Sequence, residues 1–166
     1  MFSTIETVND EDPTPTEMEI DGTDIVEDVR RRQCTANLVQ AMSTITLLDV
    51  VDGETLMATV RIERRASGPT LVFSDSSGTV LVLAETRLAE DPVQLDASES
   101  AAVEFPVEFV VNRCDPHAIA EITKRYGLDL HVEVDGARAV PVPVDIGTLV
   151  PQLEEIVERC RTTGEQ

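Results

Sequence analysis

The clearest periodicity in the chain is a two-residue alternation over residues 103–111. Every second position is apolar, and the polar or proline positions between them include Glu104, Pro106 and Glu108. Successive side chains of a strand point to opposite faces, so this segment is predicted to be a strand with one buried face. Proline has no N–H to donate, so Pro106 is expected at an edge or where the N–H position points to solvent.

The region before this strand alternates between apolar runs and turn residues. Asp52-Gly53 separates the apolar runs 45–51 and 55–62, and this dipeptide is typical of type I′ hairpin turns. Another tight turn is expected at residues 75–78, where Asp, Ser and Gly gather. These patterns predict a mostly antiparallel sheet.

The region after residue 111 predicts a helix, a hairpin and a second helix. Asp115 is expected to cap a helix that has Pro116 in its first turn, ends at Tyr126 and is followed by Gly127. A hairpin is expected around Asp135-Gly136, between strands at 128–134 and 137–142. The apolar spacing over residues 146–161 predicts a C-terminal helix.

Residues 25–45 carry two apolar stripes on a helical wheel of about 100° per residue. Ile25, Val29 and Ala36 lie on one side. Cys34, Leu38, Ala41, Met42 and Ile45 lie nearly opposite. Because a single amphipathic helix keeps one stripe, the change of phase predicts a break near Gln33, with a strand at 25–32 and a short helix at 35–43.

These elements predict an α+β fold, a mostly antiparallel sheet with two short helices and a C-terminal helix. The order strand 25–32, helix 35–43 and strands matches the order strand 103–111, helix 115–126 and hairpin 128–142. One alternative is therefore a duplicated strand–helix–strands unit, and the other is an unduplicated α+β domain.

Charge divides the chain. The 166 residues include 32 acidic and 13 basic side chains, for a net charge of −19, and all ten charged residues within positions 1–29 are acidic. With Pro13 and Pro15 among them, residues 1–22 are predicted to be an acidic disordered tail before a single α+β domain at 23–166. The charge and the preference for arginine over lysine are typical of a halophilic protein or of a GC-rich genome.

Apolar runs and cysteines indicate the compartment. No run approaches the roughly 18 apolar residues of a membrane span. The first residues also show no basic region followed by an apolar region, the pattern of a secretory signal peptide. A cytoplasmic location without a membrane partner is therefore expected. Cys34, Cys114 and Cys160 are odd in number and widely spaced, which predicts reduced cysteines.

Motifs for chemistry are weak. His117 follows Cys114 by three residues, and His131 could be a third ligand, but no further residue completes a tetrahedral zinc set. The glycines occur singly in turns, so no phosphate-binding loop is recognisable. We therefore expect a non-enzymatic binding protein, with no metal, no cofactor and no small-molecule substrate.

The predicted strand–helix–strands order resembles a single domain of the DNA sliding clamps, which are processivity factors of DNA replication. The resemblance covers about residues 25–145 and is carried by Val29–Met42, 71–75, 80–86 and 108–142. Within the last range, Ile119–Ile122 followed by 128–134 resembles the helix and ensuing strand of the clamp. The resemblance implies duplex DNA as a partner and self-association, because clamp rings contain several such domains.

The clamp resemblance also implies which side chains face DNA. Phosphate contacts position a protein without reading sequence, so they require basic residues on the inner helices. The candidates at or beside the two predicted helices are Arg30, Arg31, Arg32, Arg113, Lys124 and Arg125. The alternative is that these side chains are solvated partners of nearby carboxylates.

Two other classes fit parts of the pattern. A helix, an antiparallel sheet, a helix, two strands and a final helix resemble the type III secretion chaperones and related regulatory proteins, which bind peptides or protein partners without chemistry. The helix at 146–161 fits this class better, and a strand before the first helix separates the two because only the clamp requires it. A third class, an acidic virion or DNA-mimic protein, rests on charge alone.

Overall fold

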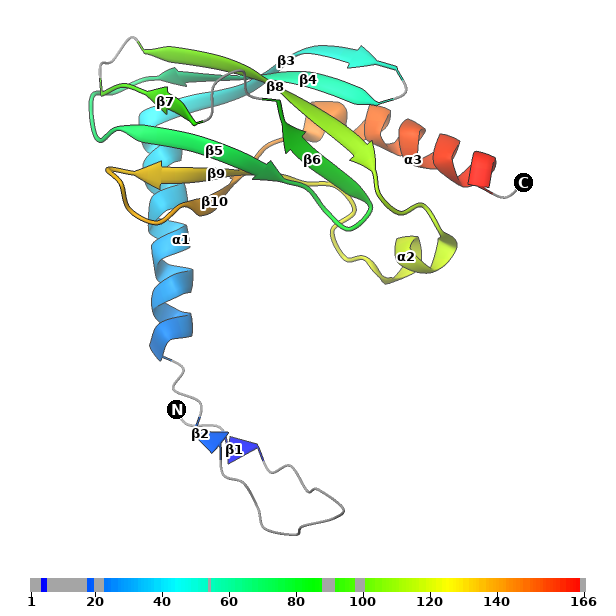
Figure 1. Cartoon of the computed structure of the whole chain (residues 1–166), viewed down its shortest axis with the longest axis horizontal. Helices are drawn as coiled ribbons and strands as arrows, with labels where there is room; N and C mark the ends of the chain where they lie inside the picture. Colours follow the sequence, from blue (N-terminus) through cyan, green and yellow to red (C-terminus); the bar gives the residue numbers. More distant parts are fainter. Residues whose placement is uncertain are drawn as a thin grey trace. The chain divides into compact units, whose positions relative to one another are not determined.

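The computed structural model describes residues 4–5, 18–19, 23–53, 55–87, 92–97 and 101–164 (Figure 1). The chain divides into two units, residues 1–34 and residues 35–166, which are treated separately. The disordered tail predicted at residues 1–22 falls outside the described residues, apart from strands β1 (Thr4–Ile5) and β2 (Met18–Glu19), which pair antiparallel.

The predicted α+β class is confirmed. The elements after β2 are α1 (Thr23–Met42), β3 (Ser43–Asp52), β4 (Leu56–Arg64), β5 (Leu71–Ser77), β6 (Val82–Thr86), β7 (Val93–Leu95), β8 (Ala102–Val111), α2 (Pro116–Glu121), β9 (Leu128–Val134), β10 (Val140–Val144), the 3₁₀ turn η1 (Gly147–Leu149) and α3 (Val150–Gly164). Strands β3 to β10 form two antiparallel sheets with the orders β3-β4-β8-β6 and β10-β9-β5-β7.

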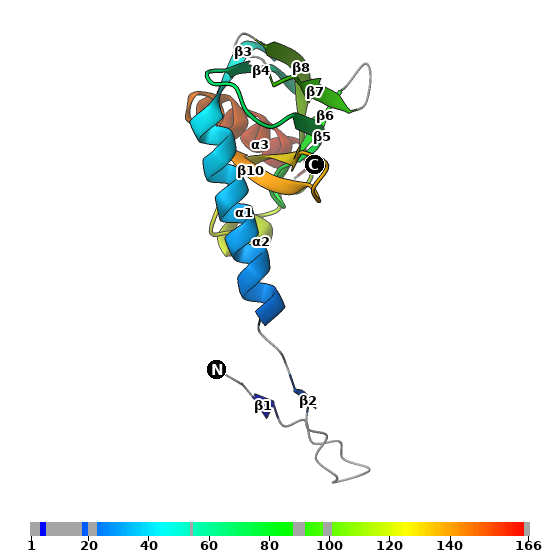
Figure 2. The same cartoon turned by 90° about the vertical axis from the view of Figure 1, so that its left-hand side faces the viewer.

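The core of residues 35–166 is formed by both sheets and α3. Phe73 of β5 and Phe105 of β8 join the two sheets, with ring centroids 6.3 Å apart. Helix α3 lies against β4 and β8 (Figure 2). Its buried side chains, including Leu153 and Ile156, follow the helical spacing predicted from the sequence.

The alternation predicted for residues 103–111 is present in β8. Phe105, Val107 and Phe109 are buried. Strand β8 lies between β4 and β6 and is not an edge. Pro106 nevertheless fits, because β6 ends at Thr86, opposite Val107. Beyond that end the Pro106 carbonyl accepts a hydrogen bond of 2.9 Å from the N–H of Arg87.

The break predicted near Gln33 is wrong, because residues Thr23–Met42 form one helix. Val39, which is fully buried, lies on the same side of the wheel as Ile25 and Ala36, so the C-terminal turns of this helix bury the first of the two stripes. The same stripe is exposed in the N-terminal turns, where Ile25 and Val29 lie. Asp28 also pairs with Arg32 one turn away, a spacing that stabilises helix and not strand. The proposed duplicated unit therefore lacks its first strand.

Helix α2 is shorter than expected. Asp115 caps it as predicted, since its carboxylate accepts a 3.0 Å hydrogen bond from the N–H of Ala118. The helix ends at Glu121 and not at Tyr126, because Ile122 is extended. Beyond the helix, the carbonyl of Arg125 accepts a 2.8 Å hydrogen bond from the Thr79 hydroxyl.

The two predicted hairpins are present. Strands β3 and β4 pair antiparallel, as do β9 and β10. Asp135 and Gly136 have φ angles of 49° and 75°, the pair of positive values that a type I′ turn needs. The type I′ turn expected at Asp52-Gly53 is wrong, because Gly53 does not have the positive φ that this turn requires.

The prediction of reduced cysteines is wrong for two of the three. Cys114 and Cys160 form a disulfide, with Cα atoms 6.0 Å apart, whereas Cys34 is free and exposed. The two bonded residues are separated by 46 positions, and only the packing of α3 beside the segment before α2 brings them together. Within the described residues, no helix is long and apolar enough to cross a membrane.

Candidate functional site

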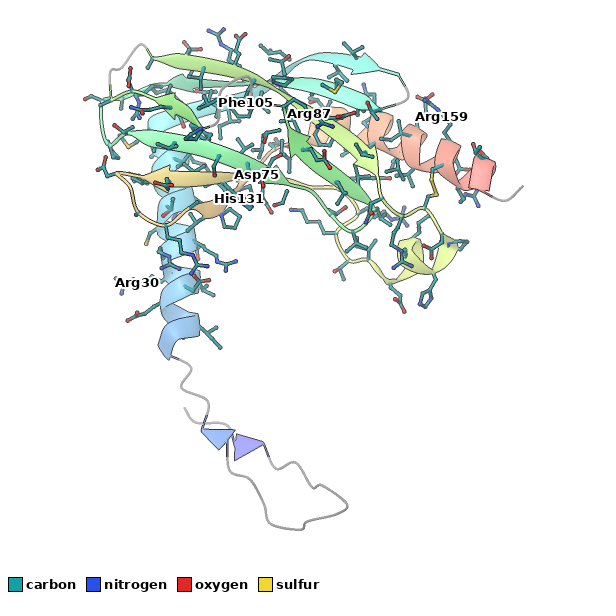
Figure 3. All side chains as sticks on the ribbon, viewed as in Figure 1. Arg30, Asp75, Arg87, Phe105, His131 and Arg159 are labelled. Atoms are coloured by element: carbon teal, nitrogen blue, oxygen red, sulfur yellow. A yellow bond between two sulfur atoms is a disulfide. The ribbon has the colours of Figure 1, made fainter. Side chains whose placement is uncertain are left out.

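The three arginines predicted to bind DNA before the first helix lie within α1, in residues 1–34. All three are exposed, and Arg30 is labelled in Figure 3. Asp28 forms ion pairs with Arg31 and, at 2.5 Å, with Arg32. Partial desolvation acts to raise the pKa of Asp28, but the guanidinium groups of Arg32 and Arg31 outweigh it, so the pKa is lowered. Two of these three arginines therefore already have a carboxylate partner.

The other three predicted DNA-binding residues lie around α2, in residues 35–166. Arg113 forms an ion pair of 3.0 Å with Asp115. Lys124 and Arg125 are exposed and follow the end of α2, so they do not lie on a helix as predicted. The six candidates are thus divided between the two units.

The side chains considered as zinc ligands have separate partners. Cys114 is bonded to Cys160. His117 Nε2 lies 3.3 Å from Glu121, and His131 Nε2 lies 3.2 Å from the Ser77 hydroxyl (His131 in Figure 3).

A pocket of about 570 Å³ lies between α2 and α3 and was not predicted. Leu81, Ile119 and Val157 contribute apolar lining, while arginine and glutamate side chains of both signs also line it. Burial and the nearby Glu154 raise the pKa of Tyr126, which contributes to the wall. The mixed charges of this pocket favour no single class of ligand.

The four edge strands of the two sheets differ in how they are protected. Strand β7 has three residues, and strands β6 and β10 have five residues each. Strand β10 also contains two prolines, Pro141 and Pro143. Strand β3 has ten residues and contains neither proline nor a basic residue. Short length, proline and lysine are the usual devices that keep an edge from pairing, so β3 is the least protected edge in the described part of the chain.

Strand β3 presents unpaired backbone groups toward solvent. The N–H groups of Arg64 and Arg65 donate in opposite directions, to the Ala101 carbonyl and the Met42 carbonyl. Because these directions alternate along a strand, residues 44, 46 and 48 bond to β4, whereas the N–H and C=O groups of Ile45 and Leu47 point away from it. The regular part of the edge is residues 43–48, since the register shifts between Leu48 and Val51.

Apolar side chains accompany this free edge. Leu48, Val50 and Val51 are 37%, 38% and 61% exposed, and Ile45 and Leu47 are only partly buried against the core. A strand added beside β3 would cover Ile45 and Leu47 on the face of the sheet that packs on the core. It would cover Leu48 on the outer face.

The centre of the outer face of the same sheet carries paired charges. Arg61 of β4 pairs with Glu104 of β8 at 2.6 Å. Arg87 (Figure 3) donates to Glu108 at 2.8 Å. The hydrogen bonds from Arg87 and then Thr55 lower the pKa of Glu108. Exposed apolar side chains of this sheet therefore lie on its edge strands, at Leu48, Val50 and Val51 of β3 and at Leu83 of β6, and not at its centre.

Comparison with protein-family models, curated proteins and solved structures finds no match for this chain.

Proposed function

We propose that this protein is a non-enzymatic protein-binding module that receives an extended segment of a partner along the free edge of β3. The observation that carries the proposal is the pair of outward-facing backbone groups at Ile45 and Leu47, on an edge without proline or basic residues. Addition of a strand to such an edge is a common mode of peptide recognition, in which main-chain hydrogen bonds provide affinity.

The order of the elements supports a protein-binding role. From α1 onward, a helix is followed by antiparallel strands, a short helix, a two-stranded hairpin and a final helix. This is the order for which the sequence resembles the type III secretion chaperones and related regulatory proteins. The sliding-clamp alternative needs a strand at residues 25–32, and this segment is helical, so we do not carry that function forward.

Charge favours one kind of partner. The chain has 32 acidic and 13 basic residues, so a basic segment is attracted to it, whereas a second copy of this chain is repelled at low salt. The partner segment is therefore extended, alternates apolar with lysine or arginine residues, and places its apolar side chains beside Ile45 and Leu47.

The direct test uses a synthetic peptide of about eight residues, alternating valine and lysine, added to ¹⁵N-labelled protein. We expect the largest amide shifts at Ile45 and Leu47, and affinity that falls as salt is raised. A valine–glutamate peptide is the control for charge, and duplex DNA is the control for the clamp alternative. Binding of DNA in place of the basic peptide would overturn the proposal, as would the absence of shifts in β3.

Two variants separate the edge of β3 from the opposite edge of the sheet. Leu47→Pro removes an N–H that bonds to no strand, so we expect peptide binding to fall at least tenfold while the fold is retained. Leu83→Lys places a charge on an exposed position of β6, the opposite edge strand of the same sheet, and should leave binding within about twofold, because β6 lies three strands away from β3. Loss of binding in Leu83→Lys but not in Leu47→Pro would contradict a site at the edge of β3.

A further inference from the structure

The N-terminal turns of α1 carry an uncovered apolar stripe. Ile25, Val26 and Val29 are 62%, 68% and 57% exposed. At about 100° per residue, the three side chains fall within a single arc of about 100°. Helices in globular proteins normally bury such a stripe, and within the described residues this one is not covered.

The charges of this part of α1 are arranged in order. The acidic block, Glu27 and Asp28, comes first, and the basic block, Arg30, Arg31 and Arg32, follows after Val29. Two such helices side by side in parallel would place like charges together. An antiparallel pair would instead place the acidic block of each helix beside the basic block of the other.

We propose that a second copy of this chain covers the stripe, with the two α1 helices antiparallel and Val29 near the two-fold axis. Such an interface is isologous, because the same residues of both copies meet. Asp28 and Arg32 lie on the same flank of the stripe. In an antiparallel pair with a two-fold axis perpendicular to the helices, this flank of one helix lies beside the same flank of the second helix. Each Asp28 then pairs with Arg32 of the second copy.

The inference goes beyond the peptide-binding role, because it uses residues 25–33 and leaves the edge of β3 untouched. Nine helical residues span only about 13 Å, so the dimer is expected to be weak and concentration-dependent. The large negative charge opposes association, and salt near physiological strength screens that repulsion while close pairs persist.

The first test is sedimentation equilibrium of the whole chain over a concentration series. Val29→Lys puts a charge at the centre of the interface and should raise the dissociation constant at least tenfold. Leu38→Lys is the matched control, because Leu38 is 37% exposed and lies opposite Val29 on the wheel, so its dissociation constant should not change. A wild-type chain that stays monomeric at every concentration would overturn the proposal.

Charge reversal tests the pairing itself. Asp28→Arg and Arg32→Glu each replace two symmetric attractions by repulsions, so each variant alone should dimerise about tenfold more weakly. An equimolar mixture of the two variants should form heterodimers with restored affinity. Single variants that associate as well as the wild type, or a mixture that shows no recovery, would contradict the exchange of Asp28–Arg32 pairs between copies.

Cross-linking tests the orientation. In a Cys34→Ser background, Val29→Cys should form an intermolecular disulfide under mild oxidation. Ile25→Cys should not cross-link to itself, but it should cross-link to Gln33→Cys on the second copy. Efficient self-linking at both positions 25 and 29 would show a parallel pair and would refute the antiparallel arrangement.

Discussion

At the scale of single residues, Asp115 determines where α2 begins. Its carboxylate accepts a hydrogen bond from the N–H of Ala118, and Arg113 lies 3.0 Å from the same carboxylate. The backbone hydrogen bond from Ala118 has the largest effect and lowers the pKa of Asp115; desolvation opposes it, and Arg113 lowers the pKa further. The sequence alone indicated this cap, because an Asp-Pro pair before an apolar helical pattern is a local signal.

Asp115 makes stability pH-dependent. A carboxyl whose pKa is lowered by folding contributes stability that is present above its unfolded pKa and is lost as the pH falls through the folded pKa. Asp115→Ala should therefore lower the Tm by about 2 to 4 °C at neutral pH. Asp115→Asn keeps an acceptor for the cap and should lose less stability between neutral and acid pH than the wild type. Thermal unfolding over a pH series measures the Tm of both variants. If the Tm of Asp115→Asn falls at acid pH as much as that of the wild type, the carboxylate does not have this role.

At the scale of elements, the disulfide joins α2 to α3. Cys114 directly precedes the cap of α2, and Cys160 lies near the end of α3, so the bond ties together the two helices that line the pocket. Neither cysteine carries a local signal for pairing, because the two are 46 positions apart in the sequence. The same limit applies to the segment after α2, where Thr79, far away in sequence, donates a hydrogen bond to the carbonyl of Arg125.

Reduction of this disulfide should weaken the fold. Closing a loop of this length stabilises a protein by about 3 to 4 kcal/mol, and the Cys114→Ser, Cys160→Ser variant should lose a similar amount in denaturant unfolding. Hydrogen exchange should accelerate most in residues 112–127. Cys34→Ser is the control and should leave stability unchanged, since Cys34 is exposed.

The state of the cysteines in the cell also tests the predicted cytoplasmic location. Disulfides are rare in the reducing cytosol of most organisms. Alkylation of freshly lysed, unreduced cells followed by mass measurement should modify Cys34 alone if the bond is formed, and all three cysteines if the compartment keeps them reduced.

At the scale of the whole molecule, the excess of acidic residues governs solution behaviour. With a net charge of −19, the folded chain repels itself, and salt relieves this repulsion. The Tm should therefore rise as potassium chloride is increased from low to molar concentration. The surface ion pairs oppose this trend only weakly, because exposed pairs contribute little and are screened as well. A Tm that falls over the same range would contradict the halophilic prediction.

The sequence by itself determined the α+β class, the β8 alternation, the turn at Asp135-Gly136 and the Asp115 cap, because each depends on neighbours within about ten residues. Residues 25–32 form a helix in which Asp28 and Arg32 pair, although the two apolar stripes predicted a break there. The burial of Val39 shows which of the two stripes the C-terminal turns of this helix bury. Only the tertiary structure decided that β3 is an unprotected edge, that Cys114 meets Cys160, and that the six basic candidates fall in two separate units. These features depend on which segments distant in the sequence become neighbours, and local patterns do not encode that choice.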